Sequence, residues 1–145
     1  YKPGNISKIG VGFGLNFKEN IQDKNESEWL PGGCILHRSE NLIKKDYFPF
    51  SGKAYSEDLI HSHLLKQSGT KLFVSKKAIA YIEPIFYPDS LIELYKQFKA
   101  TNYFACLRGQ GYLRLRIFYL LRFSQISFKV IRKILFNFLR KLKKK

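Results

Sequence analysis

The sequence contains no methionine, two cysteines and no long apolar run. Because methionine is the usual first residue of a gene product, we expect this chain to be a fragment or a truncated product. Cys34 and Cys106 lie far apart in the sequence, which argues against a disulfide framework and favours a reducing compartment. No stretch reaches the roughly 18 apolar residues that a membrane-spanning helix needs.

Acidic residues are also missing from the last part of the chain. Residues 108–145 contain 12 lysines and arginines and no aspartate or glutamate, whereas residues 1–107 contain 14 basic and 11 acidic side chains. The net charge of +15 is therefore concentrated at the C-terminal end. A basic block of this kind is typical of proteins that bind an anionic partner. We expect a nearly balanced body over 1–107 and a basic tail over 108–145.

The tail is expected to be one helix, because apolar side chains recur at helical spacing and no proline or glycine follows Gly111. Its two faces comprise the apolar residues Ile117, Leu121, Phe128, Ile131, Leu135, Phe138 and Leu142 and, opposite them, the basic residues Arg122, Lys129, Lys133 and Arg140. A basic amphipathic helix favours binding of residues 112–145 to an anionic membrane surface. The alternative is a helix that packs on the body and exposes a basic rim to solvent. Nucleic acid is disfavoured as a partner, because no known nucleic-acid-binding module surrounds the tail.

The body contains the patterns of both strands and helices. Strands are predicted from alternating or short apolar runs, over residues 9–17, 34–36, 71–75 and 78–82. Helices are predicted from capping residues, a first-turn proline at Pro88 and helical spacing, over residues 40–45, 57–68 and 88–106. Ser56 suits the N-cap of the second helix and Gly69 its C-terminal end, while the polar residues 18–28 are expected to form a loop. The predicted fold class is α/β with a small mixed sheet, followed by the C-terminal basic amphipathic helix.

Two segments of the body carry residue types suited to a binding or catalytic site. Residues 29–33, Trp-Leu-Pro-Gly-Gly, form a tight turn in which the glycines let a ligand approach the backbone. Glu57 and Asp58 open a helix, and Gly69 follows Asp58 by eleven residues. Each feature also has a structural explanation. The glycines serve a turn, the two acids favour the positive end of a helix dipole, and the tryptophan packs in the core.

Taken in order, these motifs resemble a known enzyme family. Three features are similar to the C-terminal half of the catalytic domain of family 2 glycosyltransferases: the Trp-Leu-Pro-Gly-Gly run, the dipeptide at 37–38, and the Glu-Asp pair separated by ten residues from Gly-Thr-Lys-Leu. The resemblance covers about residues 10–83 and implies a partial GT-A-like domain. It also implies inverting transfer of a sugar from a nucleotide-sugar donor to a glycan or lipid-linked acceptor, in the synthesis of a surface polysaccharide or glycolipid. The implied place is the cytoplasmic, inner face of the cell membrane, where such donors and acceptors meet.

The resemblance implies a role for each site residue. Asp58 corresponds to the general base that takes the proton from the acceptor hydroxyl, and Glu57 orients the acceptor or Asp58. The implied substrate-binding residues are Trp29, Pro31, Gly32, Gly33 and Arg38. Among these, the turn brings backbone amides to the donor, the tryptophan stacks on a sugar ring and the arginine faces phosphate. Mg²⁺ or Mn²⁺ is the implied cofactor. The Asp-x-Asp motif of the family does not occur in this chain, so no metal ligand is assigned and the chain alone is expected to be inactive.

Two functions of other classes compete with this interpretation. A metal-dependent hydrolase would draw its ligands from Cys34, His37, His61 and His63. On a helix, however, His61 and His63 point about 200° apart and do not easily share one ion. The other competitor is a non-catalytic peripheral membrane-binding module, in which the α/β body only supports the tail.

Overall fold

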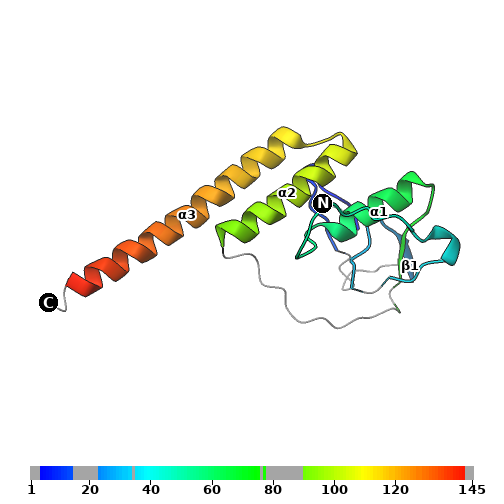
Figure 1. Ribbon diagram of the computed structural model, residues 1–145. Coiled ribbons are helices and arrows are strands. Elements are labelled where there is room, and N and C mark those ends of the chain that lie inside the picture. The colour runs from blue at the N-terminus through cyan, green and yellow to red at the C-terminus, as the bar shows by residue number, and fades with distance from the viewer. Residues whose placement is uncertain (1–3, 15–22, 34, 76, 78–89, 143–145) are drawn as a thin grey trace.

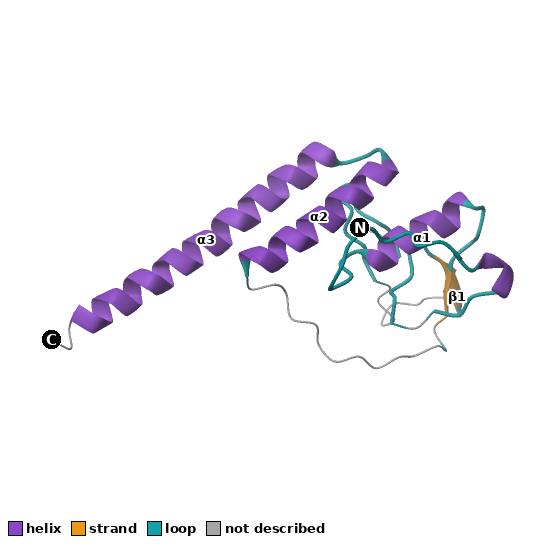
Figure 2. Cartoon of the chain, in the orientation of Figure 1, coloured by secondary structure: helices purple, strands orange, loops and turns teal. Residues whose placement is uncertain are grey.

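The structure of the protein is a computed structural model that describes residues 4–14, 23–33, 35–75, 77 and 90–142 (Figure 1). Over these residues the chain is mixed α/β and mostly helical, with three α-helices and a two-stranded antiparallel sheet (Figure 2). The elements in chain order are β1 (Lys24–Glu26), a 3₁₀ turn (Ser39–Asn41), α1 (Glu57–Gln67), β2 (Phe73–Ser75), α2 (Leu91–Arg108) and α3 (Tyr112–Leu142).

The sheet in the described residues is antiparallel rather than mixed. β1 pairs with β2 in the register Lys24↔Ser75, Asn25↔Val74 and Glu26↔Phe73. The strand predicted at 71–75 is confirmed as β2. The prediction of a loop over 18–28 is wrong at Lys24–Glu26, which form β1. β1 is polar, so it lacks the apolar alternation that marks a strand in sequence. Its pairing depends on β2, against which the ammonium group of Lys24 lies 4.2 Å from the centroid of the Phe73 ring. The strand predicted at 78–82 lies outside the described residues.

Over the described residues 9–14, the strand predicted at 9–17 is reduced to an isolated antiparallel bridge between Gly12 and Ile6. There the chain turns back on itself at Gly10, whose φ is 78° and whose N–H donates to the carbonyl of Ser7 at 3.0 Å. The N–H of Ser7 in turn donates to the carbonyl of Val11 at 2.8 Å across this turn. A positive φ is easily adopted by glycine, so the glycine that reads as the bare face of a strand serves a turn instead.

Two other short elements differ from the prediction. Ile35 and Leu36 belong to no strand, and Leu36 is 98% exposed; Cys34 lies outside the described residues. The helix predicted at 40–45 is reduced to the 3₁₀ turn Ser39–Asn41, in which no residue is buried. Short segments of this kind need tertiary packing to be stable, and here they receive little of it.

α1 confirms the helix predicted at 57–68, but its first turn is built differently. At the C-terminal end, Gly69 takes a φ of 84° and its N–H donates to the carbonyl of Lys66 at 3.0 Å, as expected for a helix stop. Ser56 precedes the helix, yet its side chain does not cap it. Its hydroxyl lies instead 3.2 Å from the hydroxyl of Thr101 on α2. The predicted side-chain N-cap is therefore wrong, because a tertiary contact has taken the hydroxyl.

α2 confirms the helix predicted at 88–106 from Leu91 onward, and its first turn is capped; Pro88 lies outside the described residues. The hydroxyl of Ser90 accepts a hydrogen bond from the backbone N–H of Glu93 at 3.1 Å. The carboxylate of Glu93 accepts from the hydroxyl of Tyr55 and from the ammonium group of Lys96. Glu93 therefore links the start of α2 to the loop before α1.

Replacing Ser90 with alanine should lower the free energy of unfolding by about 1 kcal/mol, because the N–H of Glu93 loses its side-chain acceptor. Urea denaturation of the wild type and the variant measures this difference. The matched control is Ser124→Ala in the exposed middle of α3, where the serine hydroxyl donates to a carbonyl of its own helix. Equal losses of stability in both variants would count against the capping role.

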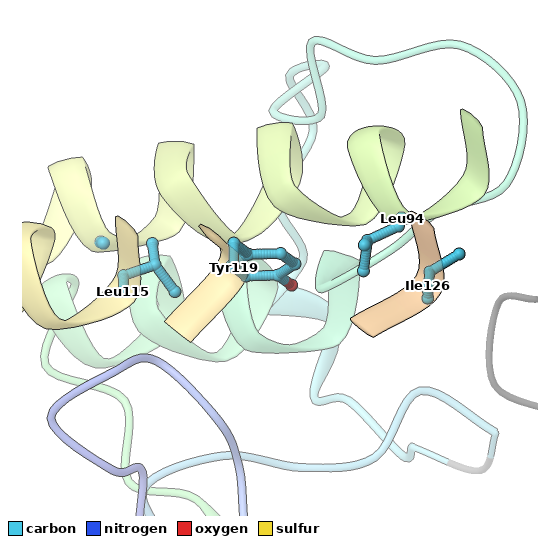
Figure 3. Close-up of a cluster of buried hydrophobic side chains, with 5 residues drawn as sticks. Leu94, Leu115, Tyr119 and Ile126 are labelled. Carbon is cyan, nitrogen blue, oxygen red and sulfur yellow. The ribbon is translucent and has the colours of Figure 1, made fainter. Parts of the chain in front are cut away.

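Two hydrophobic clusters join the helices. The first lies between α2 and α3 and comprises Leu94, Ala105, Leu115, Tyr119 and Ile126. Figure 3 shows Leu94 of α2 close to Tyr119 and Ile126 of α3. The second cluster lies between α1 and α2 and comprises Leu59, Ile60 and Phe104. α2 is thus the central helix, which holds α1 on one side and α3 on the other.

α3 packs on α2 along its first half. Ile126 is its last buried residue among the side chains described, which end at Phe136. Beyond this point α3 runs past the N-terminal end of α2 (Figure 1). No helix in the described part of the chain is both long enough and apolar enough to cross a membrane.

Candidate active site

The Glu-Asp pair lies at the N-terminal end of α1, where the backbone N–H groups of the first turn have no partner within the helix. The carboxylate of Asp58 accepts a hydrogen bond from the N–H of Leu59 at 2.9 Å. Asp58 is half-buried, so this backbone donor holds its carboxylate in a partly enclosed position.

The Pro-Gly-Gly turn lies directly against this pair. A Cβ atom built on Gly32 would stand 3.5 Å from the Cβ atom of Asp58 and 3.7 Å from Oε2 of Glu57. The turn is held there by the N–H of Leu30, which donates to the buried hydroxyl of Ser62 on α1 at 2.9 Å. Two segments that the sequence separates by about 25 residues therefore form one site.

Burial raises the pKa of the Asp58 carboxyl above its usual range. The hydrogen bond from Leu59 opposes this effect, the negative charge of Glu57 adds to it, and the neighbouring backbone of Gly32 opposes it again. A half-buried carboxylate with a raised pKa is a stronger base than one in water, which suits it to accept a proton.

Glu57 is held by a tyrosine that the sequence analysis did not single out. The hydroxyl of Tyr47 donates a hydrogen bond to Oε1 of Glu57. Burial, together with this bond and the charge of Glu57, raises the pKa of the Tyr47 hydroxyl. Tyr47 therefore stays protonated at neutral pH and remains a donor that fixes the direction of the Glu57 carboxylate.

Two histidines complete the cluster around Glu57. His61 follows Glu57 by one turn of α1, and its ring stacks on Tyr47 with the centroids 5.3 Å apart. The ring of His37 meets His61 edge-on at 4.9 Å. Burial, followed by the influence of His37, lowers the pKa of His61, while Glu57 opposes the change. The i, i+4 spacing of Glu57 and His61 was the signal in the sequence that places both on one side of α1.

The zinc-site alternative finds no support in the described residues. His63 lies elsewhere on α1, with its ring 5.9 Å from that of Phe104, whereas His61 faces Tyr47 and His37. The helix thus separates the two histidines as their spacing predicts. Among the residues that the structure describes, no group of three or more His, Cys, Asp and Glu side chains is arranged to hold a metal ion.

The same finding bears on the Mg²⁺ or Mn²⁺ implied by the resemblance. At the candidate site the carboxylates are those of Glu57 and Asp58, and both already accept hydrogen bonds from protein donors. A hard divalent cation needs several oxygen ligands. The described residues do not fit such a cation by themselves.

Trp29 occupies a packing position in the structure. Its ring lies against Gly12, where an added Cβ would stand 2.5 Å from the indole, and it packs on the cluster between α1 and α2. Its indole N–H donates to the carbonyl of Phe13 at 3.3 Å. This placement is the one expected of a core tryptophan, and it supports the Pro-Gly-Gly turn from behind. Pro31 and Gly33 are exposed in that turn.

Arg38 is exposed and lies in a different place from the carboxylate pair. It lines an open pocket of about 580 Å³ between the C-terminal end of α1, the sheet and the 3₁₀ turn. The basic side chains of this pocket are Lys24, His37, Arg38 and Lys71. Neither Glu57 nor Asp58 lines it. The structure thus brings Gly32 to the Glu-Asp pair and leaves Arg38 in a neighbouring pocket.

The raised pKa of Asp58 predicts a pH-dependent change in stability. The folded state binds the proton of the Asp58 carboxyl more tightly than the unfolded chain does. Asp58 therefore stabilises the fold below its ordinary pKa near 3.8, and this stabilisation is lost as the pH rises through the raised pKa. Asparagine does not titrate, so the Asp58→Asn variant does not show this pH-dependent loss of stability. We therefore expect the stability of the variant relative to the wild type to increase between acidic and neutral pH. Urea denaturation at a series of pH values measures the difference, and a constant or shrinking difference contradicts the prediction.

A scan against models of protein families and searches of curated proteins and of solved structures found no match to the chain. The resemblance to family 2 glycosyltransferases therefore remains a prediction, based on the ordered motifs of the sequence.

Proposed function

We propose that this chain carries the acceptor-activating part of an inverting glycosyltransferase, with Asp58 as the general base. The observation that supports it is the close approach of the Pro-Gly-Gly turn to the Glu-Asp pair, since a Cβ atom on Gly32 would stand 3.5 Å from the Cβ atom of Asp58. These are the two motifs that the resemblance assigns to donor binding and to catalysis. A GT-A-like arrangement of the domain is part of the same proposal.

In the proposed step, the Asp58 carboxylate takes the proton of an acceptor hydroxyl while the hydroxyl oxygen attacks the anomeric carbon of the donor sugar. A new glycosidic bond forms, and the bond from the anomeric carbon to the nucleoside diphosphate breaks. The diphosphate leaves with the electron pair, and the configuration at the anomeric carbon is inverted. Glu57, oriented by Tyr47, would accept a hydrogen bond from the acceptor and hold its reacting hydroxyl near Asp58.

The proposed donor is a nucleotide-sugar, and the exposed residues Pro31 and Gly33 mark the side from which it would approach the turn. Backbone N–H groups near glycine suit a diphosphate, because no side chain stands in the way. The acceptor would be a glycan or a lipid-linked sugar at the inner face of the cell membrane, for a surface polysaccharide. In this proposal Trp29 supports the turn, and Arg38 is available to a phosphate in the neighbouring pocket.

A second candidate function is a non-catalytic membrane-binding module, and the exposed apolar side chains of α3 favour it. Asp58 is essential for a transferase and dispensable for a membrane-binding module. A transfer assay decides between the two functions. It measures the nucleoside diphosphate that is released from UDP- and GDP-sugars in the presence of a lipid extract. The comparison is between the full-length protein and its Asp58→Asn variant. Loss of acceptor-dependent release in the variant supports the transferase, and unchanged release contradicts it.

A further inference from the structure

We propose that one face of α3 binds the surface of an anionic lipid bilayer, with the helix lying parallel to that surface. We call this face the outer stripe. It comprises Leu113, Ile117, Leu120, Leu121, Phe128, Ile131, Ile134 and Leu135. The inference does not depend on the catalytic proposal, because the outer stripe contains none of the residues of the candidate active site.

The packing of α3 on α2 leaves the outer stripe uncovered. The side chains that α3 buries are those of Leu115, Tyr119 and Ile126. At about 100° per residue these three lie on one side of the helix, and the centre of the outer stripe lies about 160° away around the axis. Packing on the body thus accounts for one apolar face of α3, while the second apolar face has no partner within the described residues.

The outer stripe is long and strongly exposed. Its eight side chains are between 50% and 72% exposed. From Leu113 to Leu135 the stripe extends along about 33 Å of helix, at about 1.5 Å per residue. Eight large apolar side chains facing water on one side of a helix, interrupted only by Ser124 and Ser127, are typical of a binding surface rather than of the ordinary exterior of a small protein.

Positive charge borders the stripe on both sides. Arg114 and Arg132 lie about 80° from its centre in one direction, and Arg116 lies about as far in the other. All three side chains are exposed, and no acidic residue occurs anywhere in 108–145. When the stripe enters the acyl region, arginines at its edges reach the level of anionic headgroups. Each such contact adds electrostatic attraction to the burial of apolar surface.

Charge also argues against two other occupants. A second copy of the chain, packed stripe to stripe, would bring like charges together along both edges without any acidic partner. A nucleic acid would pair with the arginines but would leave the eight apolar side chains of the stripe in water. An anionic bilayer satisfies both the apolar stripe and its basic borders.

The experiment is sedimentation of the full chain with vesicles of phosphatidylcholine alone and of phosphatidylcholine mixed with phosphatidylglycerol. The test variant replaces three residues of the outer stripe with glutamine, which keeps helix propensity high. The substitutions are Leu121→Gln, Phe128→Gln and Leu135→Gln. We expect the wild type to bind the anionic vesicles and the variant to bind them at least about 100-fold more weakly, because three large apolar side chains no longer enter the lipid.

A matched control removes the same amount of exposed apolar surface outside α3. Its substitutions are Leu36→Gln, Leu42→Gln and Ile92→Gln, at residues that are 98%, 51% and 69% exposed. This control is expected to bind anionic vesicles like the wild type. Far-UV circular dichroism of both variants checks that α3 remains helical.

Three results would overturn the proposal. The first is equal binding of the wild type and the outer-stripe variant to anionic vesicles. The second is equal binding of the wild type to vesicles with and without phosphatidylglycerol. The third is a wild type that ignores vesicles but forms a dimer that the outer-stripe substitutions disrupt, measured by analytical ultracentrifugation. None of them affects the proposal for Asp58, which the transfer assay tests separately.

Discussion

Replacing Asp58 with asparagine in the full-length protein is expected to lower the rate of sugar transfer by about 10²–10⁴-fold. Asparagine keeps the size and much of the hydrogen bonding of the side chain, so the backbone N–H of Leu59 still finds an acceptor oxygen. What it removes is the ability to accept the proton of the acceptor hydroxyl. The loss should therefore appear in kcat, with a much smaller change in KM for the donor.

The matched control for this variant is Asp23→Asn. Asp23 is an exposed carboxylate that pairs with Lys77 at 3.1 Å and lies outside the candidate active site. Exposed ion pairs contribute little to stability, so the control should retain the transfer rate of the wild type. If Asp58→Asn and Asp23→Asn transfer sugar at the same rate, the assignment of Asp58 as the base is wrong.

A loss of activity in Asp58→Asn should occur without a loss of stability at neutral pH. Burial of the Asp58 carboxylate raises its pKa, so its charged form contributes less to stability than it would in water. A group that is unfavourable for folding but suited to proton transfer is expected at an active site, where stability and activity oppose each other. Measuring unfolding and transfer on the same samples separates a catalytic defect from a folding defect.

Replacing Phe104 with alanine is expected to lower the free energy of unfolding by about 3–5 kcal/mol. The Phe104 side chain is 0% exposed and belongs to the cluster that joins α1 to α2. Its ring also contacts the N-terminal segment, because a Cβ on Gly10 would stand 3.4 Å from it. The substitution leaves a cavity at the meeting point of three segments, and the backbone of α2 cannot close it by a small shift.

The matched control for the core substitution is Phe128→Ala on α3. It makes the same chemical change at a side chain that is 67% exposed. We expect its free energy of unfolding to stay within about 0.5 kcal/mol of the wild type. Urea denaturation with a shared m-value provides the comparison. Similar losses in both variants would show that Phe104 does not hold α1 and α2 together.

A chain of hydrogen bonds connects the start of α1 to α3. The hydroxyl of Thr101, on α2, lies 3.2 Å from that of Ser56 and 3.1 Å from that of Tyr119. Thr101 and Tyr119 are both buried. Ser56, which precedes the Glu-Asp pair, is therefore linked to α3 through the hydroxyl of Thr101. Because Thr101 and Tyr119 are buried, breaking their hydrogen bond costs free energy.

The candidate site could be predicted from the sequence only in part. The order of the Pro-Gly-Gly and Glu-Asp motifs predicted that Gly32 and Asp58 serve one site, and the structure places them in contact. The hydrogen bond from Tyr47 to Glu57 could not be predicted, because Tyr47 lies in a loop with no periodicity to orient it. The same holds for the packing of Trp29, whose ring could equally have faced solvent.

The sequence by itself determined the three helices and the concentration of positive charge in the tail. Helices α1, α2 and α3 form where local signals agree, since capping residues, glycine stops and apolar spacing act within a few residues of one another. The tertiary structure decided which apolar face of α3 packs on α2 and where the polar strand β1 finds its partner. These outcomes depend on contacts between residues far apart in the chain, whose free energies no local pattern contains.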